Sequence, residues 1–177
     1  MTGRNEYGNA LFMLAREEGT VEAVRDDAEA AYTALKLNPE YIKLLDTPAV
    51  SKEEKISLID KAFSSLHYSV TNLLKMLCEK HSVHTFREVY LTYSALYDEF
   101  MGIERVEALT AIKLSAEKER AISEKLAKMT GKRIVLRNTV NPEILGGVIL
   151  RFSGTQIDGS VKSRLDAFSE SLKNINL

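Results

Sequence analysis

The hydrophobic period of this sequence changes at Gly102, and this change limits the possible folds more than any other feature. Before Gly102, apolar residues recur every three or four positions, which is the spacing of the buried side of a helix. After Gly102, apolar positions alternate with neighbours of mixed polarity as far as Leu114, which indicates a strand with one buried face. The sequence therefore predicts a helical part followed by a part that contains a sheet.

Helix-breaking and helix-capping residues divide the first part into six predicted helices. These signals are Gly19, Asn38-Pro39, Thr47-Pro48, the capping box Ser51-x-x-Glu54 and a second such box, Thr85-x-x-Glu88. The first helix is predicted over about residues 4 to 18, and the sixth ends near residue 101. Short connections between six helices favour an antiparallel bundle.

Three strands and two helices are predicted after Gly102. The first strand includes Val106 to Leu114, and Ser115 can cap the helix that follows. Residues 133–140 and 147–152 are two further strands, separated by Asn141-Pro142 and a glycine pair. A last helix begins near residue 160, and its apolar stripe is Val161, Leu165, Phe168, Leu172 and Ile175.

The predicted fold class is α+β, with an N-terminal six-helix antiparallel bundle (residues 1–103) followed by a small β-α-β-β-α domain (residues 104–177). The two predicted domains carry opposite net charge. Residues 1–103 contain 11 Lys+Arg against 16 Asp+Glu, or −5, and residues 104–177 contain 13 against 9, or +4. The total of −1 argues against a general nucleic-acid binder, which needs a clear basic excess.

The sequence contains no apolar run long enough to cross a bilayer and no signal-peptide region near Met1. A single cysteine, Cys78, cannot form an intramolecular disulfide, which fits a reducing compartment. We therefore expect a soluble protein of the cytoplasm.

The stretch Gly154 to Ser160 has the G-x-x-x-x-G spacing of a phosphate-binding loop. However, Ser160 stands where that motif needs lysine, and Val161 stands where it needs the hydroxyl that binds Mg²⁺. The structural interpretation is that Asp158 or Ser160 caps the last helix while the glycines permit tight turns. A nucleotide-binding protein that uses Gly154–Ser160 remains the alternative, together with a small helical adaptor.

No other pattern predicts a cofactor, a metal or a catalytic residue. Cys78, His81 and His84 have a spacing that could suggest zinc, but these positions drift around a helix and no second ligand cluster accompanies them. No nucleophile lies in a recognisable strained turn.

The first predicted helix is apolar on every side from Ala10 to Ala15. Such a helix either lies at the centre of a bundle or shares a groove with a helix from a partner. The residues alone leave these two possibilities equally open.

Several motifs together resemble the delta subunit family of bacterial F-type ATP synthases, the counterpart of the mitochondrial oligomycin-sensitivity-conferring protein. The strongest is Ile134 to Ser153, which continues through Ile157-Asp158-Gly159-Ser160-Val161 to Arg164-Leu165. Tyr7 to Ala15 is similar to the opening helix of the family. The structural signature consists of Pro142, Gly146, Gly147, Asp158, Gly159 and Ser160. The chain departs from the family at Gly8, where alanine is usual, and at His81 to Val83.

The resemblance implies a non-catalytic stator subunit, present once in the hetero-oligomer at the cytoplasmic face of the bacterial cell membrane. Such a subunit links the catalytic head to the b subunits, so that rotation is coupled to proton transport and ATP synthesis. Its implied partners are the alpha subunits of the head and the C-terminal ends of the b subunits.

The resemblance also implies where these partners bind. An alpha-subunit N-terminal helix is expected in a groove between the first and fifth helices of residues 1–103, lined by Tyr7, Ala10, Leu11, Leu14, Val70, Leu73, Leu74 and Leu77. The b subunits are expected on residues 104–177, at Gly146, Gly147, Ile157, Leu165 and Phe168.

Overall fold

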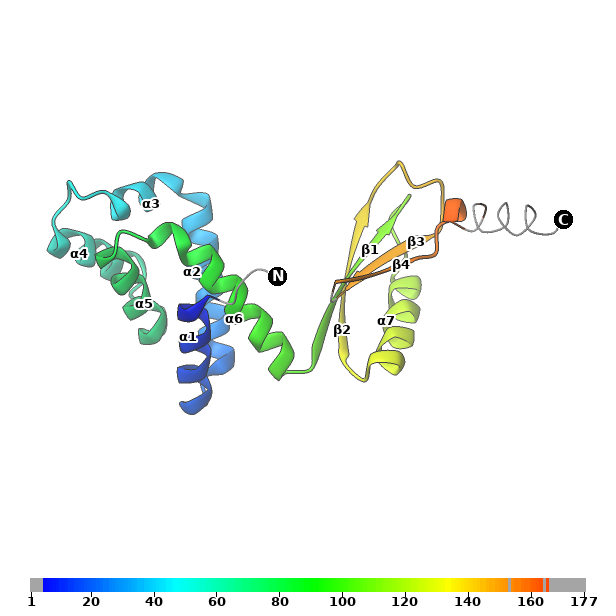
Figure 1. Cartoon of the computed structure of the whole chain (residues 1–177), viewed down its shortest axis with the longest axis horizontal. Helices are drawn as coiled ribbons and strands as arrows, with labels where there is room; N and C mark the ends of the chain where they lie inside the picture. Colours follow the sequence, from blue (N-terminus) through cyan, green and yellow to red (C-terminus); the bar gives the residue numbers. More distant parts are fainter. Residues whose placement is uncertain (1–4, 153, 164, 166–177) are drawn as a thin grey trace, which may run out of the picture. The chain divides into compact units, whose positions relative to one another are not determined.

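The computed structural model describes residues 5–152, 154–163 and 165, and the chain divides into two compact units between Phe100 and Met101 (Figure 1). Unit 1 contains helices and unit 2 contains a four-stranded sheet with a helix. This mixture of helix and sheet confirms the predicted α+β class.

The described part of unit 1, residues 5–100, contains six α-helices and one short 3₁₀-helix. Their bounds are α1 Glu6–Glu17, α2 Val21–Leu37, α3 Pro39–Asp46, α4 Lys52–Ala62, α5 Tyr68–Glu79, η1 Val83–Thr85 and α6 Phe86–Phe100. Local capping signals explain several of these starts. The Asn5 side chain accepts hydrogen bonds from the Tyr7 and Gly8 amides, and Ser51 and Glu54 form the predicted capping box.

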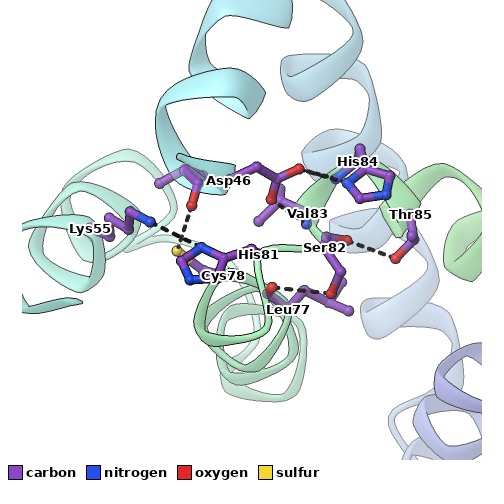
Figure 2. Close-up of polar contacts among 10 residues, drawn as sticks. Asp46, Lys55, Leu77, Cys78, His81, Ser82, Val83, His84 and Thr85 are labelled. Carbon is purple, nitrogen blue, oxygen red and sulfur yellow. Dashed lines mark hydrogen bonds and ion pairs between the residues drawn. The ribbon is translucent and has the colours of Figure 1, made fainter. Parts of the chain in front are cut away.

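The second predicted capping box, at Thr85 and Glu88, is wrong. The helix η1 leads directly into α6, and the Thr85 hydroxyl donates to the Ser82 carbonyl oxygen at 2.7 Å. The free amides of this connection are satisfied from α3 instead, because the Asp46 carboxylate accepts from Val83 N at 2.7 Å and His84 N at 3.2 Å (Figure 2). A tertiary contact has therefore replaced the local cap.

The core of unit 1 forms around α6, which packs against α1 and α2. Tyr93 of α6 is fully buried, and its ring meets Phe12 of α1 edge to face with the centroids 5.5 Å apart. The Tyr93 hydroxyl donates to the Val21 carbonyl oxygen of α2 at 2.9 Å. Burial raises the pKa of Tyr93, which therefore stays a hydrogen-bond donor.

Gly8 allows α1 to approach α6 closely. A Cβ atom on Gly8 would lie 2.7 Å from Thr92 Cβ and 2.8 Å from the Val89 carbonyl oxygen. The contact between α1 and α6 at Gly8 therefore has no room for a methyl group.

Unit 2 is a mixed sheet with the strand order β2-β1-β3-β4. The strands are β1 Ile103–Thr110, β2 Arg133–Val140, β3 Val148–Phe152 and β4 Thr155–Asp158. Strand β1 is parallel to β2 and antiparallel to β3, and β4 is antiparallel to β3. Helix α7, Ala116–Thr130, joins β1 to β2 and packs against β2 (Figure 1). The side chain of Ser115 caps α7 as predicted.

Strand β1 begins and ends earlier than the alternating pattern predicts. It runs from Ile103 to Thr110, so Ile112 lies beyond it and is 74% exposed. Asn138 explains where the strand ends, because its side chain donates to Ala108 O and accepts from Leu114 N. These bonds hold the loop before α7 against the end of β2.

The predicted β-α-β-β-α order contains one strand fewer than the structure. Residues Thr155 to Asp158, interpreted above as part of a turn region, form β4 at the edge of the sheet and pair with β3. Their sequence has no apolar alternation, so the strand depends on its partner across the turn at Gly154. Residues 161–163 and 165 are helical, while Phe168, Leu172 and Ile175 lie outside the described residues.

The Gly8 contact gives a stability prediction. Replacing a helical glycine by alanine normally favours the helix by about 1 kcal/mol, but overpacking costs ~1–3 kcal/mol. We expect Gly8→Ala to lower the free energy of unfolding in urea denaturation followed by circular dichroism. The variant Ala10→Gly, at an exposed position of the same helix, measures the propensity effect alone. A more stable Gly8→Ala protein would contradict the close-contact interpretation.

Candidate functional site

Two polar contacts join α1 to α5, one near each end of the helix pair. The Lys80 ammonium donates to the Tyr7 hydroxyl at 2.8 Å and lies 5.2 Å from the centre of the Tyr7 ring. At the other end, the Tyr68 hydroxyl donates to the Glu18 carboxylate. Because the start of α1 meets the end of α5 and the end of α1 meets the start of α5, the two helices run antiparallel. The hydrogen bonds raise the pKa of both Lys80 and Tyr68.

Apolar side chains between these two contacts are exposed. Leu14 of α1 is 40% exposed, and Met76 and Tyr68 of α5 are 43% and 54% exposed. On α1, Leu14 follows Tyr7 by two turns and lies on the same stripe as Glu18. On α5, Met76 lies one turn before Lys80 and two turns after Tyr68. We call the surface formed by Tyr7, Ala10, Leu14, Tyr68 and Met76 the α1/α5 face.

The eight residues predicted to line a groove divide between surface and interior. Leu14 and Ala10 are exposed and Tyr7 is half-buried. The other five are buried within unit 1, namely Leu11, Val70, Leu73, Leu74 and Leu77. These five side chains support the two helices from below, and the three accessible ones belong to the α1/α5 face.

Helix α1 is buried on one side and exposed on another, so burial does not account for all of its apolar residues. Leu11, Phe12 and Ala15 are buried in unit 1, whereas Leu14 is exposed on the α1/α5 face. Tyr68, Met76 and Lys80 of this region were not among the residues predicted from the sequence. Their spacing of four and eight residues along α5 is the signal that could have identified a stripe beside the buried one.

The glycine pair predicted for the second surface is used inside unit 2. The Gly146 carbonyl oxygen accepts from Val161 N at 3.0 Å, and Gly159 N donates to Val148 O at 3.0 Å. Gly147 has a φ angle of +87°, and a Cβ atom there would lie 2.4 Å from the Gly159 carbonyl oxygen. Both glycines thus serve the close approach of two backbone segments, the start of β3 and the turn after β4.

The remaining residues predicted for this surface are at the edge of the sheet and beyond it. Ile157 of β4 is 41% exposed and Leu165 is 58% exposed. Phe168 lies outside the described residues. Among the described residues of the predicted set, Ile157 and Leu165 are therefore the side chains that a partner could contact.

The signature residues around Ser160 form a helix cap. The Asp158 carboxylate accepts from Ser160 N at 2.8 Å, and the Ser160 hydroxyl accepts from Ser163 N at 3.2 Å. Ser160 is thus the capping residue, one of the two candidates predicted. The backbone hydrogen bond from Ser160, followed by that from its side chain, lowers the pKa of Asp158. Pro142 is exposed in the turn that the Asn141 side chain stabilises by accepting from Glu143 N.

The geometry of Gly154 to Ser160 is incompatible with a phosphate-binding loop. Such a loop directs several successive amide groups towards one anion. Here Thr155 to Asp158 are extended and paired with β3, from Phe152 opposite Thr155 to Ile149 opposite Asp158. Amides of a paired strand do not converge, so the alternative of a nucleotide site at this position is not supported.

Cys78, His81 and His84 do not share a site either (Figure 2). The Cys78 thiol is buried and lies 3.5 Å from the Leu45 carbonyl oxygen, and burial raises its pKa. His81 Nδ1 lies 3.4 Å from the buried Lys55 ammonium, and His84 Nδ1 lies 2.7 Å from the Asp46 carboxylate. Within the described part of the chain, no group of three or more His, Cys, Asp or Glu could hold a metal ion.

The sequence matches the family described as ATP synthase delta (OSCP) subunit over residues 4–172. ATP synthase subunit delta of Rubrobacter xylanophilus is 32% identical over 173 residues, covering 97% of this chain and 97% of that protein. The corresponding subunit of Carboxydothermus hydrogenoformans is 33% identical over 171 residues, covering 94% of each chain. A chain in the cryo-EM structure of the Toxoplasma gondii mitochondrial ATP synthase hexamer has the same fold, with a TM-score of 0.72, 23% identity and coverage of 97% of this chain and 98% of that one.

The fold and these matches define a class of non-catalytic structural subunits of a larger complex. The chain belongs to the ATP synthase delta (OSCP) subunit family, whose members are non-catalytic components of the peripheral stalk of F-type ATP synthases. The resemblance predicted from the sequence is confirmed. None of the helices described here is long and apolar enough to span a membrane.

The two glycine environments in unit 2 predict different effects of alanine. Gly147→Ala adds both left-handed strain and a clash with backbone, so we expect a loss of about 3 kcal/mol. Gly154 has a φ angle of +74° with no atom within 4 Å of an added Cβ, so Gly154→Ala should lose only about 1 kcal/mol. Hydrogen exchange at the β3 amides measures both losses in unit 2 alone. Equal losses would contradict the close approach at Gly147.

The lowered pKa of Asp158 predicts a pH dependence. A carboxyl whose folded pKa lies below its ordinary value of 3.8 stabilises the fold above that value, and this contribution disappears as the pH falls through the folded pKa. We therefore expect Asp158→Ala to increase hydrogen exchange around Ser160 at neutral pH, and the difference from the wild type to shrink below about pH 4. Asp158→Asn, which keeps an acceptor, should lose less. If the difference in hydrogen exchange between Asp158→Ala and the wild type does not change with pH, the ionised carboxylate is not its cause.

Proposed function

We propose that this subunit links the catalytic head to the peripheral stalk through one contact on each unit. In this proposal, the N-terminal domain, residues 1–103, is an antiparallel six-helix bundle that binds the N-terminal helix of an alpha subunit. Residues 104–177 bind the C-terminal ends of the b subunits. A single copy at the cytoplasmic face of the bacterial membrane then keeps the head from turning with the rotor.

The observation that carries this proposal is the α1/α5 face. Leu14 and Met76 are large apolar side chains, exposed by 40% and 43%, on two helices that polar contacts join at both ends. A partner helix that lies along a helix pair uses apolar anchors one or two turns apart. The exposed apolar side chains of the α1/α5 face have a similar spacing. The buried leucines beneath it make the face a firm support, so little ordering is needed when the partner binds.

Two contacts on one chain also suit a component that must resist torque. Once one partner is bound, the other is held at a high local concentration, so neither contact needs extreme affinity by itself. The opposite net charges of residues 1–103 and 104–177, −5 and +4, disfavour exchange of the two partners.

We expect the double variant Leu14→Gln/Met76→Gln to bind a peptide of the alpha-subunit N-terminus at least about tenfold more weakly than the wild type. Burial of one leucine or methionine side chain contributes ~1.5–3 kcal/mol, and glutamine preserves helix propensity. The affinity is measured by calorimetry with the full chain and a peptide from the same organism.

The matched control is Leu91→Gln, because Leu91 is 45% exposed on α6 and lies outside the α1/α5 face. Thermal unfolding of all three proteins checks that they remain folded. If the folded double variant binds the peptide with wild-type affinity, the alpha-subunit helix does not bind at the α1/α5 face. If Leu91→Gln weakens binding equally, the effect is not specific to this face.

A further inference from the structure

One face of the sheet in unit 2 carries a row of charged and polar side chains across all four strands. Residues that are paired in register point to the same side of a sheet. Glu107 of β1 is paired with Arg137 of β2 and with Arg151 of β3, and Arg151 is paired with Gln156 of β4. Arg105 lies two residues before Glu107 and therefore on the same side. We call this surface the arginine face.

The opposite side of the sheet is the one that α7 covers. Val106 and Ala108 alternate with Arg105 and Glu107 along β1, and both are buried, as is Leu126 of α7. The arginine side chains are exposed, and the surface around them forms an open depression of about 780 Å³. The side under α7 therefore buries apolar side chains, whereas the other side exposes the arginine side chains.

The depression is strongly basic. Of the described residues that line it, three are arginines and one, Glu107, is an acid. Thr139 donates to the Glu107 carboxylate at 3.0 Å, and Arg151 Nε donates to the Gln156 side-chain oxygen at 2.9 Å. The depression is also lined by Val135 of β2, which is 39% exposed and lies two residues before Arg137 on the same side of the sheet. It therefore combines an excess of positive charge with contact area for an apolar side chain.

We propose that the arginine face binds an acidic, partly apolar segment of a partner polypeptide, which, if the proposed function holds, belongs to the b subunits. Arginine guanidinium groups present two parallel N–H donors that match the two oxygens of a carboxylate. Exposed ion pairs contribute little while water surrounds them, but a segment that covers the depression displaces this water and strengthens them.

Charge also decides which of the two units such a segment selects. Residues 104–177 carry a net charge of +4, whereas residues 1–103 carry −5 and repel an acidic chain. The glycine pair at Gly146 and Gly147 is occupied by internal backbone contacts, as described above. The arginine face, by contrast, is exposed and carries an excess of positive charge.

The test is the affinity of the full-length protein for the C-terminal half of the b subunit from the same organism. We expect Arg137→Glu/Arg151→Glu to weaken binding at least tenfold. Raising the ionic strength from about 0.05 M to about 0.5 M should weaken wild-type binding and have a much smaller effect on this variant. The matched control is Arg120→Glu/Lys128→Glu, which makes the same change of net charge on exposed positions of α7.

If the folded Arg137→Glu/Arg151→Glu protein binds the b fragment with wild-type affinity, the arginine face is not the binding surface. The proposed link between unit 2 and the b subunits would still stand in that case. An equal loss in the α7 control would also overturn it, since net charge alone would then explain the effect. If the wild type itself fails to bind the b fragment, the proposed function of unit 2 fails together with this inference.

Two further measurements keep the test decisive. If charge reversal unfolds unit 2, Arg137→Gln/Arg151→Gln removes the charge with less repulsion, and it must still weaken binding of the b fragment. Lipid vesicles provide the competing partner class. They consist of phosphatidylcholine with roughly 30% phosphatidylglycerol, which gives them the negative surface charge of an anionic bilayer. Binding to these vesicles through Arg137 and Arg151, without binding to the b fragment, would assign the face to lipid and overturn the proposal.

Discussion

The packing of α6 against α1 and α2 is the interaction on which the rest of unit 1 depends. Tyr93 connects all three helices, since its ring meets Phe12 and its hydroxyl donates to the Val21 carbonyl oxygen. Gly8 lets α1 approach α6 without a side chain between them. With α1 held in this way, one of its sides is buried and Leu14 remains exposed beside α5. The surface proposed for the alpha subunit is thus a consequence of how the core is closed.

Unit 2 depends in the same way on close contact between backbones. Gly147 lets the start of β3 pass close to the turn after β4, because a Cβ atom on Gly147 would lie 2.4 Å from the Gly159 carbonyl oxygen. This contact places β4 at the edge of the sheet and Ser160 at the start of the next helix. Strand β1 then lies inside the sheet, with α7 on one side and the arginine face on the other. Glycines that suggested a phosphate loop therefore build the frame of an interaction surface.

The two units present surfaces of different chemistry, as a linking subunit requires. The α1/α5 face is mainly apolar and bounded by the Tyr7–Lys80 and Tyr68–Glu18 contacts, which suits a helix with an apolar stripe. The arginine face is basic and suits carboxylates. If each face binds the partner proposed for it, this difference in chemistry lowers the affinity of each partner for the other's face.

Local signals in the sequence determined the helices, several of their caps and membership of the family. Ser51 with Glu54, Asn5 and Ser115 act through neighbours within a few residues, so their effect can be predicted without a fold. The tertiary structure alone decided the features that depend on distant residues. Asp46 replaced the cap expected at Thr85, Asn138 accompanied the early end of β1, and β3 induced a strand in the polar stretch at Thr155. Periodicity marks the apolar side of a helix but not what covers it, and therefore only packing separated buried Leu74 from exposed Met76. Likewise, Arg137 and Arg151 lie far apart in the sequence and become neighbours of Glu107 only through strand register.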